Sequence, residues 1–254
     1  MAVQPGPTKT YHLTTYDSIS PTLPALSQKG KNVVITGGGT GIGQAIALSF
    51  AKASVTNLAL LGRRLEPLED TKSLINTSYP NVSVHIYTAD VADEATLNQA
   101  FVSFAQAAGG VIHTLIANAG VLSLGKVLDI DTESFMKSLE TNALGTLNTV
   151  KSFMPHIPTE PDSTGFRARI IHTSSAAVQL DFPYNMNYTV GKLAGAKIMQ
   201  HVAAEHPDVF VLNYHPGTVA TPMTDIATKA GFELAKDDGK YPLSICDLKT
   251  AKVE

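Results

Sequence analysis

From residue 31 onward, short apolar runs alternate with longer amphipathic segments. The apolar runs have the composition of strands that are buried on both faces of a sheet, and they lie at 31–36, 57–61, 82–88, 111–117, 169–173 and 209–214. The intervening segments have the length and pattern of helices, and they lie at 41–53, 66–78, 94–108, 132–156 and 187–205. This alternation predicts a three-layer α/β fold, in which helices cover both faces of a doubly wound parallel sheet.

The two ends of the chain depart from this pattern. Residues 1–30 contain four prolines that break regular elements, so an extended arm is expected before a single domain at 31–254. From about residue 224 the tail diverges: 224–235 could form a short helix, and 241–248 is the only later apolar stretch. Pro242 weakens that stretch as an interior strand. Either the sheet ends at six strands or a divergent tail completes it.

Composition narrows the classes of partner. The net charge is −3, and the scattered basic residues form no cluster suited to nucleic acid or an anionic membrane. No apolar run resembles a secretory signal or reaches about 18 residues. The single cysteine, Cys246, excludes an internal disulfide framework, and no histidine has metal-ligand spacing. We therefore expect a cytoplasmic protein that binds no metal, nucleic acid or membrane.

A glycine-rich loop follows the first predicted strand. It reads Thr36-Gly37-Gly38-Gly39-Thr40-Gly41-Ile42-Gly43 and leads into a helix, where free N–H groups and the helix dipole favour a phosphate. Glycines let the backbone approach a pyrophosphate and let the helix pack close to the sheet. The loop predicts a dinucleotide site, and a purely structural turn is the alternative.

Tyr188 and Lys192 lie four residues apart in a predicted helix, so both side chains share one face. An ammonium ~4 Å away would lower the pKa of a phenol, ordinarily about 10, by up to about three pH units, and burial would act in the opposite direction. Such a phenol can give or take a proton near neutral pH. Alone, this spacing is weak evidence, because it also occurs by chance.

Together, the glycine loop and the Tyr188–Lys192 pair closely resemble the short-chain dehydrogenase/reductase family, over about residues 8–223. The resemblance implies a Rossmann-like fold, and the arm and the loop look like those of fungal members. Further family motifs follow in order along the chain: Asp90-Val91, Asn118-Ala119-Gly120, Asn142, Ser175 thirteen residues before Tyr188, and Pro216-Gly217.

The resemblance also implies a role for each residue. Tyr188 would give a proton to a substrate carbonyl and Ser175 would donate a second hydrogen bond. Lys192 would bind the nicotinamide ribose and lower the Tyr188 pKa, and Asn142 would hold a water that connects Lys192 to solvent. The implied cofactor-binding set is Gly37, Thr40, Gly41, Ile42, Arg63, Arg64, Asp90, Val91, Asn118, Ala119, Gly120, Tyr188, Lys192, Pro216, Gly217, Val219 and Thr221.

The end of the second predicted strand bears on the choice of cofactor. An acidic residue there commonly binds the ribose 2′-hydroxyl of NAD, but here Gly62 is followed by Arg63 and Arg64. A guanidinium can hold a 2′-phosphate through charge-assisted hydrogen bonds. NADP(H) is therefore favoured over NAD(H), and the alternative is that both arginines are simply a solvated helix start.

The implied activity is NADPH-dependent reduction of a carbonyl, or oxidation of a secondary alcohol, on a small to medium-sized, partly apolar metabolite. The alternative is a cofactor-binding protein of the same fold with a non-redox role, cyclisation or partner binding, in secondary metabolism. A homodimer is expected through 132–156 and 187–205, the usual dimer faces of the family. Small and apolar residues would allow close packing there: Ala143, Gly145, Ala194, Gly195 and Met199.

Overall fold

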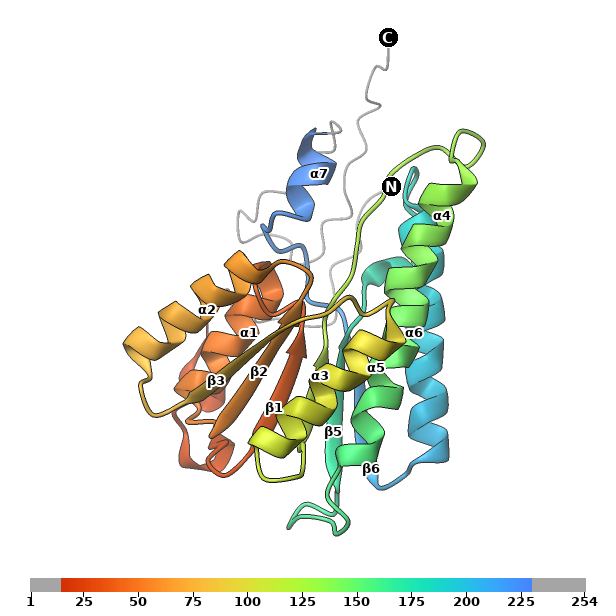
Figure 1. Ribbon diagram of the computed structural model, residues 1–254. Coiled ribbons are helices and arrows are strands. Elements are labelled where there is room, and N and C mark those ends of the chain that lie inside the picture. The colour runs from red at the N-terminus through yellow and green to blue at the C-terminus, as the bar shows by residue number, and fades with distance from the viewer. Residues whose placement is uncertain (1–14, 230–254) are drawn as a thin grey trace.

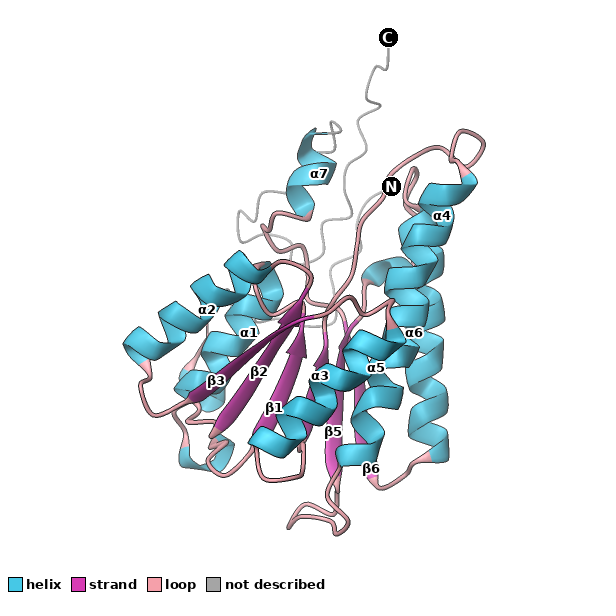
Figure 2. Cartoon of the chain, viewed as in Figure 1, coloured by secondary structure: helices cyan, strands magenta, loops and turns pink. Residues whose placement is uncertain are grey.

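A computed structural model describes residues 15–229 and has one parallel sheet at its centre. The sheet order is β3-β2-β1-β4-β5-β6, so the direction of winding reverses between β1 and β4 (Figure 2). Ligands of such sheets bind beyond the carboxyl ends of the strands at this reversal. The predicted doubly wound fold is confirmed. The strands are β1 (Asn32–Thr36), β2 (Asn57–Gly62), β3 (Ser83–Thr88), β4 (Thr114–Ala117), β5 (Ala168–Thr173) and β6 (Val209–Tyr214).

Helices form a layer on each face of the sheet (Figure 1). One face is covered by α1 (Gly41–Lys52) and α2 (Leu65–Ser78). The other is covered by α3 (Glu94–Ala107), α4 (Thr132–Leu139), α5 (Gly145–Phe153) and α6 (Met186–Glu205), while α7 (Thr224–Lys229) lies beyond the carboxyl ends of the strands. No helix within residues 15–229 has the length and apolarity that crossing a membrane requires.

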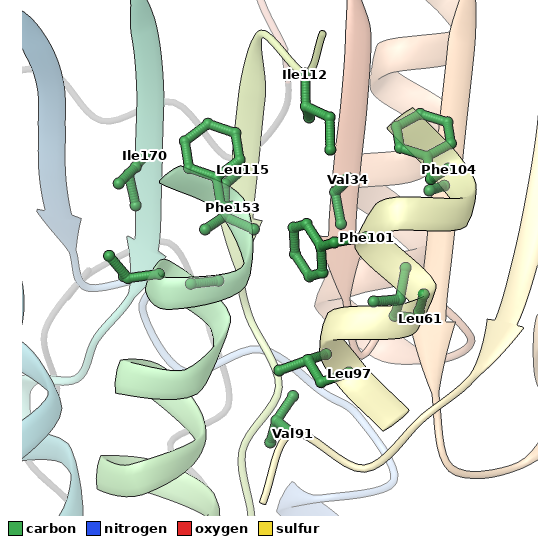
Figure 3. Packing of buried hydrophobic residues seen from close by; sticks show 14 of the residues in the cluster. Val34, Leu61, Val91, Leu97, Phe101, Phe104, Ile112, Leu115, Phe153 and Ile170 are labelled. Carbon is green, nitrogen blue, oxygen red and sulfur yellow. The ribbon is translucent and has the colours of Figure 1, made fainter. Parts of the chain in front are cut away.

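Alternate residues of β1 supply the two cores, which is why its three central residues are all apolar. Val33 and Ile35 pack in the cluster beneath α1 and α2. Val34 packs on the opposite face with Phe101 and Phe153 (Figure 3). All five residues of β1 are buried, and burying each large apolar side chain stabilises the fold by roughly 1.5–3 kcal/mol. These two cores fix the carboxyl ends of the central strands.

The segment predicted as one helix at 132–156 changes its hydrogen bonding along its length. Between α4 and α5 lies a π-helical segment, η3 (Glu140–Leu144), and a 3-10 turn, η4 (Met154–His156), follows α5. The prediction of one uninterrupted α-helix is therefore wrong. π-helical turns are frequent at functional sites, and this one carries the fully buried Asn142.

The termini also differ from the expected pattern. Residues 15–30 are not extended, because they contain two 3-10 turns, η1 (Asp17–Ile19) and η2 (Pro24–Leu26). The fixed φ of proline suits the first position of a helical turn, which Pro24 occupies. Residues 1–14 and the apolar stretch at 241–248 lie outside the described residues, so the question of a further strand stays open.

Of the residues expected at a subunit face, Gly145, Gly195 and Met199 pack within the chain, whereas Ala143 and Ala194 are partly exposed. A Cβ at Gly195 would stand 2.7 Å from the backbone oxygen of Asn142, and one at Gly145 would stand 2.5 Å from Cγ2 of Val91. Met199 is fully buried in the core. These residues therefore allow close packing of helices in one chain. The exposed apolar side chains of the same region are Met136, Leu144, Leu147, Val190 and Leu193.

Candidate active site

The glycine loop between β1 and α1 is held in a conformation that side chains would disrupt. Gly37 has φ +69°, and the N–H groups of Gly37 and Gly38 both donate to the backbone oxygen of Leu61, at 2.8 and 3.1 Å. A Cβ at Gly43 would stand only 2.1 Å from the Gly37 oxygen. Thr40 is the N-cap of α1, and its side chain makes no capping hydrogen bond. The start of α1 therefore suits a phosphate.

A cavity of about 360 Å³ lies beside this loop. Eight predicted cofactor-binding residues line it: Gly37, Thr40, Arg63, Arg64, Asp90, Val91, Ala119 and Gly120. The prediction missed eight further residues that line it: Gly39, Leu61, Pro67, Leu68, Ala89, Thr141, Pro222 and Ile226. Of these residues, only Gly39 could have been identified from the sequence, because it belongs to the glycine run. These features fit a dinucleotide. The loop glycines leave no room for side chains, the start of α1 has no side-chain cap, and Arg63 and Arg64 provide two adjacent positive charges.

Arg63 and Asp90 face each other at the outer end of the cavity. Nη1 of Arg63 lies 3.9 Å from Oδ2 of Asp90, and both side chains are about half exposed, so this ion pair contributes little to stability. Oδ1 of Asp90 accepts a hydrogen bond from the backbone of Ala92 at 3.0 Å. The N-cap of α3 is Asp93, so Asp90 is not needed for capping. This arrangement leaves both polar side chains at the cavity wall.

The structure brings Ser175, Tyr188 and Lys192 together beyond the carboxyl end of β5. Tyr188 and Lys192 occupy successive turns near the start of α6, and Nζ of Lys192 lies 6.0 Å from the centre of the Tyr188 ring. The same Nζ donates a hydrogen bond to the backbone oxygen of Thr173 at 2.8 Å. The Ser175 hydroxyl lies close enough to the Tyr188 phenol to lower its pKa. One hydroxyl, one phenol and one ammonium thus share a site in which Lys192 is buried and the other two side chains are partly exposed.

Burial governs the protonation of this group. Desolvation raises the pKa of the Tyr188 phenol, and the nearby Ser175 hydroxyl opposes that rise. Desolvation also lowers the pKa of Lys192 to about 8. The expected net lowering of the Tyr188 pKa is not found in the chain alone, because desolvation of the phenol is the largest effect. Tyr188 stays protonated at neutral pH and can act as a proton donor.

The amide of Asn142 fixes the loop that follows β4. Its Oδ1 accepts from the backbone N–H of Val121, and its Nδ2 donates to the backbone oxygen of Val121, both at 3.0 Å. Nδ2 also donates to Oγ of Ser138 at 3.1 Å. A Cβ at Gly120 would stand 3.0 Å from Oδ1 of Asn142 and 3.2 Å from Nζ of Lys192. Asn142 thus borders Lys192, and its water-holding role stays a prediction.

Asn118 connects the central strands. Its Nδ2 donates to the backbone oxygen of Thr36 at 3.0 Å, and its Oδ1 accepts from Oγ1 of Thr173 at 3.2 Å. Oγ1 of Thr36 in turn accepts from the backbone N–H groups of Asn118 and Ala119, at 3.0 and 3.1 Å. The sequence reasoning missed both threonines. The sequence could have indicated them, because each threonine is the last residue of a strand and lies next to a recognised motif.

The loop after β6 approaches the glycine loop. A Cβ at Gly41 would stand 3.0 Å from Cγ2 of Thr221. Gly217 has φ +80°, which favours glycine at this turn. Pro216, Gly217, Val219 and Thr221 do not line the cavity beside the glycine loop, and neither does Ile42 in the first turn of α1. Their contacts with a cofactor stay predictions.

Comparison with known proteins gives consistent matches. The model of the family described as short chain dehydrogenase matches residues 31–230. A short chain dehydrogenase/reductase of Claviceps purpurea is 32% identical over 242 residues, which cover 94% of this chain and 78% of that protein.

Two solved structures share the fold and more than a quarter of the sequence. An alcohol dehydrogenase from Thermococcus sibiricus, complexed with 5-hydroxy-NADP, has a TM-score of 0.67 and 27% identity, with 74% of this chain and 76% of that one covered. The NADPH-dependent 3-quinuclidinone reductase from Rhodotorula rubra has a TM-score of 0.69 and 26% identity, with 86% and 79% covered. The first structure contains an NADP derivative, and the second protein is NADPH-dependent.

Proposed function

The chain belongs to the short-chain dehydrogenase/reductase family, a family of oxidoreductases, and we propose that it is an NADPH-dependent carbonyl reductase. The observation that carries the proposal is the convergence of Ser175, Tyr188 and Lys192 next to a cavity built for a dinucleotide. The substrate is a small to medium-sized, partly apolar ketone or aldehyde, or the corresponding secondary alcohol in the reverse direction. Incubation of the protein with NADPH and a panel of carbonyl compounds, followed by absorbance of the reduced nicotinamide, tests this activity.

Each side chain has its own role in the reduction. When bound, a nicotinamide cofactor would supply the hydride that reduces the carbonyl carbon. The Tyr188 phenol gives its proton to the carbonyl oxygen as negative charge develops there, and Ser175 donates a hydrogen bond to the same oxygen. Lys192 would hold the nicotinamide ribose. The closeness of Ser175 to Tyr188 favours this redox function over the cofactor-binding alternative with a non-redox role.

The apolar character of the substrate is supported by the residues around the site. Val121, Leu122 and Met223 line the cavity next to the catalytic group. Leu180 and Val219 are exposed on the two loops that follow β5 and β6. Such a surface binds the hydrocarbon part of a metabolite and leaves the polar contacts to Ser175 and Tyr188.

The preference for NADPH is expected to reverse when Gly62 is replaced with aspartate. A carboxylate at the end of β2 would repel a 2′-phosphate and accept hydrogen bonds from the ribose hydroxyls of NADH. We expect the ratio of kcat/KM for NADPH to that for NADH to fall by at least about tenfold, from steady-state rates with each cofactor.

Gly62→Ala is the control for this exchange. A Cβ at Gly62 would meet Leu68 at 3.5 Å, an ordinary contact, so alanine adds bulk without charge. The alanine variant should keep the original preference. An aspartate variant that also keeps it would contradict the assignment of Arg63 and Arg64 to the 2′-phosphate.

The pH profile of reduction is expected to reflect Lys192. We expect kcat/KM for NADPH to stay level near neutral pH and to fall above about pH 8, where free Lys192 loses its proton and its attraction for the cofactor. Between pH 8 and the ordinary pKa of lysine, the unfolded chain binds more protons than the folded one, so this group stabilises the fold as pH rises. Unfolding therefore does not explain the fall.

The measurement is the initial rate at limiting NADPH across this pH range. Burial raises the Tyr188 pKa, so the phenol remains protonated well above pH 8. A profile that stays level until the phenol titrates would contradict the role given to Lys192.

We also propose that the protein is a homodimer. Leu144, Leu147, Val190 and Leu193 are exposed apolar side chains on η3, α5 and α6, and burying them against a second copy would remove them from water. We expect light scattering at micromolar concentration to give twice the chain mass of 26.9 kDa, and Leu193→Glu to give the single-chain mass. A single-chain mass for the unmodified protein would contradict the dimer.

A further inference from the structure

Thr173, the last residue of β5, contacts both halves of the proposed cofactor site. Its backbone oxygen accepts the hydrogen bond from Nζ of Lys192 at 2.8 Å. Its Oγ1 lies 3.2 Å from Oδ1 of Asn118 and 3.1 Å from the phenolic oxygen of Tyr214, the last residue of β6. Thr173 is 6% exposed, so water does not replace these partners readily. No other described residue joins the catalytic lysine to the asparagine at the centre of the sheet.

The chemistry of the three groups fixes the direction of the hydrogen bonds. An amide oxygen only accepts, so the single proton of the Thr173 hydroxyl must go to Oδ1 of Asn118. The contact with Tyr214 must then be a hydrogen bond that the phenol donates to Oγ1 of Thr173. The result is a directed chain that runs from Tyr214 through Thr173 to Asn118.

The far end of this chain is the glycine loop. With Oδ1 committed to Thr173, Nδ2 of Asn118 points to the backbone oxygens of Thr36 and Gly37, at 3.0 and 3.4 Å. Rotating the amide by half a turn would bring its NH₂ group against the Thr173 hydroxyl and its oxygen against two carbonyl oxygens. The orientation of Asn118 therefore controls the turn at Gly37 that faces the cavity.

We propose that Tyr214 and Thr173 are positioning residues for cofactor binding, which act by orienting the Asn118 amide and so holding the turn at Gly37. The inference rests on the nicotinamide cofactor of the proposed function and not on any substrate. Neither hydroxyl has to touch the cofactor. Tyr214 acts only through Thr173, which makes the effects of the two hydroxyls dependent on each other.

A double-mutant cycle tests this chain, because each hydroxyl can be removed with little change of shape. Thr173→Val leaves the Asn118 oxygen and the Tyr214 phenol without a partner, and we expect it to raise the Kd for NADPH about tenfold in a fluorescence titration. Tyr214→Phe should raise it about threefold, and Thr173→Ser should stay within about twofold of the unmodified protein. The double variant should match Thr173→Val alone. Effects that multiply instead would overturn the proposed order of the chain.

Hydrogen exchange of the cofactor-free protein gives an independent readout. The amide protons of the peptide covering residues 36–43 should exchange faster in Thr173→Val and Tyr214→Phe, because the turn at Gly37 is held less firmly. Unchanged exchange there would overturn the proposal. If the unmodified protein binds neither NADPH nor NADH, the proposed function fails, and hydrogen exchange still decides the role of Thr173.

Thr149→Val is the matched control. Thr149 is also a buried threonine, and its Oγ1 donates to the backbone oxygen of Gly145 within α5. Losing that hydroxyl should lower the melting temperature but leave both the Kd for NADPH and the exchange of 36–43 unchanged. If Thr149→Val changed the Kd for NADPH as much as Thr173→Val, general destabilisation would explain the result and the proposal would fail.

Discussion

Replacing Tyr188 with phenylalanine is expected to lower kcat for carbonyl reduction about a thousandfold. Proton transfer from a positioned side chain contributes roughly 10²- to 10⁴-fold, and phenylalanine keeps the ring while removing the transferable proton. The KM for NADPH should change little, because Lys192 and the glycine loop are untouched. Steady-state rates with a carbonyl substrate that the unmodified protein reduces provide the measurement.

Tyr79→Phe is a suitable control for this substitution. Tyr79 follows α2 at the amino end of the sheet, away from Ser175 and Lys192, so the loss of its hydroxyl should leave kcat unchanged. If the Tyr188→Phe variant formed product at the full rate, Tyr188 would not be the proton donor of the reaction.

Replacing Gly43 with alanine is expected to abolish NADPH binding. The added methyl group would stand 2.1 Å from the backbone oxygen of Gly37 and 2.8 Å from Nδ2 of Asn118, and neither position can be relieved by turning a flexible side chain. The start of α1 must therefore move away from the turn that receives the phosphate. We expect the Kd for NADPH to rise at least about a hundredfold and the melting temperature to fall.

Gly62→Ala separates this effect from the general cost of adding a methyl group near the cavity. That methyl group would meet only Leu68 at ordinary contact distance, so binding should be retained. Fluorescence titration with NADPH measures both variants. An unchanged Kd for Gly43→Ala would mean that the glycine loop does not hold the dinucleotide.

The fold was readable from the sequence because both faces of the central strands are buried. β1 is apolar at its three central positions, whereas α1 carries small and apolar residues on the face toward the sheet, and this contrast locates both elements. The π-helical segment η3 was not readable, because the pattern of buried positions continues through it from α4 to α5. Only the backbone hydrogen bonds reveal the extra residue in that turn.

The motif residues of the site were found by their spacing, but the contacts that orient them were not. Ser175, Tyr188 and Lys192 lie together beyond β5, and their catalytic roles stay predictions. Thr173 and Thr36 carry no motif of their own and show their importance only when β1, β4 and β5 lie side by side. The direction of the Tyr188 pKa shift was also beyond sequence reasoning, because it depends on how deeply the phenol is buried. Likewise, Gly145 and Gly195 pack inside the chain and not at a subunit face.

The most direct test of the central claim follows the hydride itself. NADPH carrying deuterium at the transferable C4 position is incubated with the protein and a panel of ketones and aldehydes, and the products are analysed by mass spectrometry. We expect an alcohol with deuterium on the former carbonyl carbon, formed by the unmodified protein and about a thousandfold more slowly by Tyr188→Phe. An alcohol product without deuterium at that carbon, or no alcohol from any compound despite NADPH binding, would contradict the proposed function.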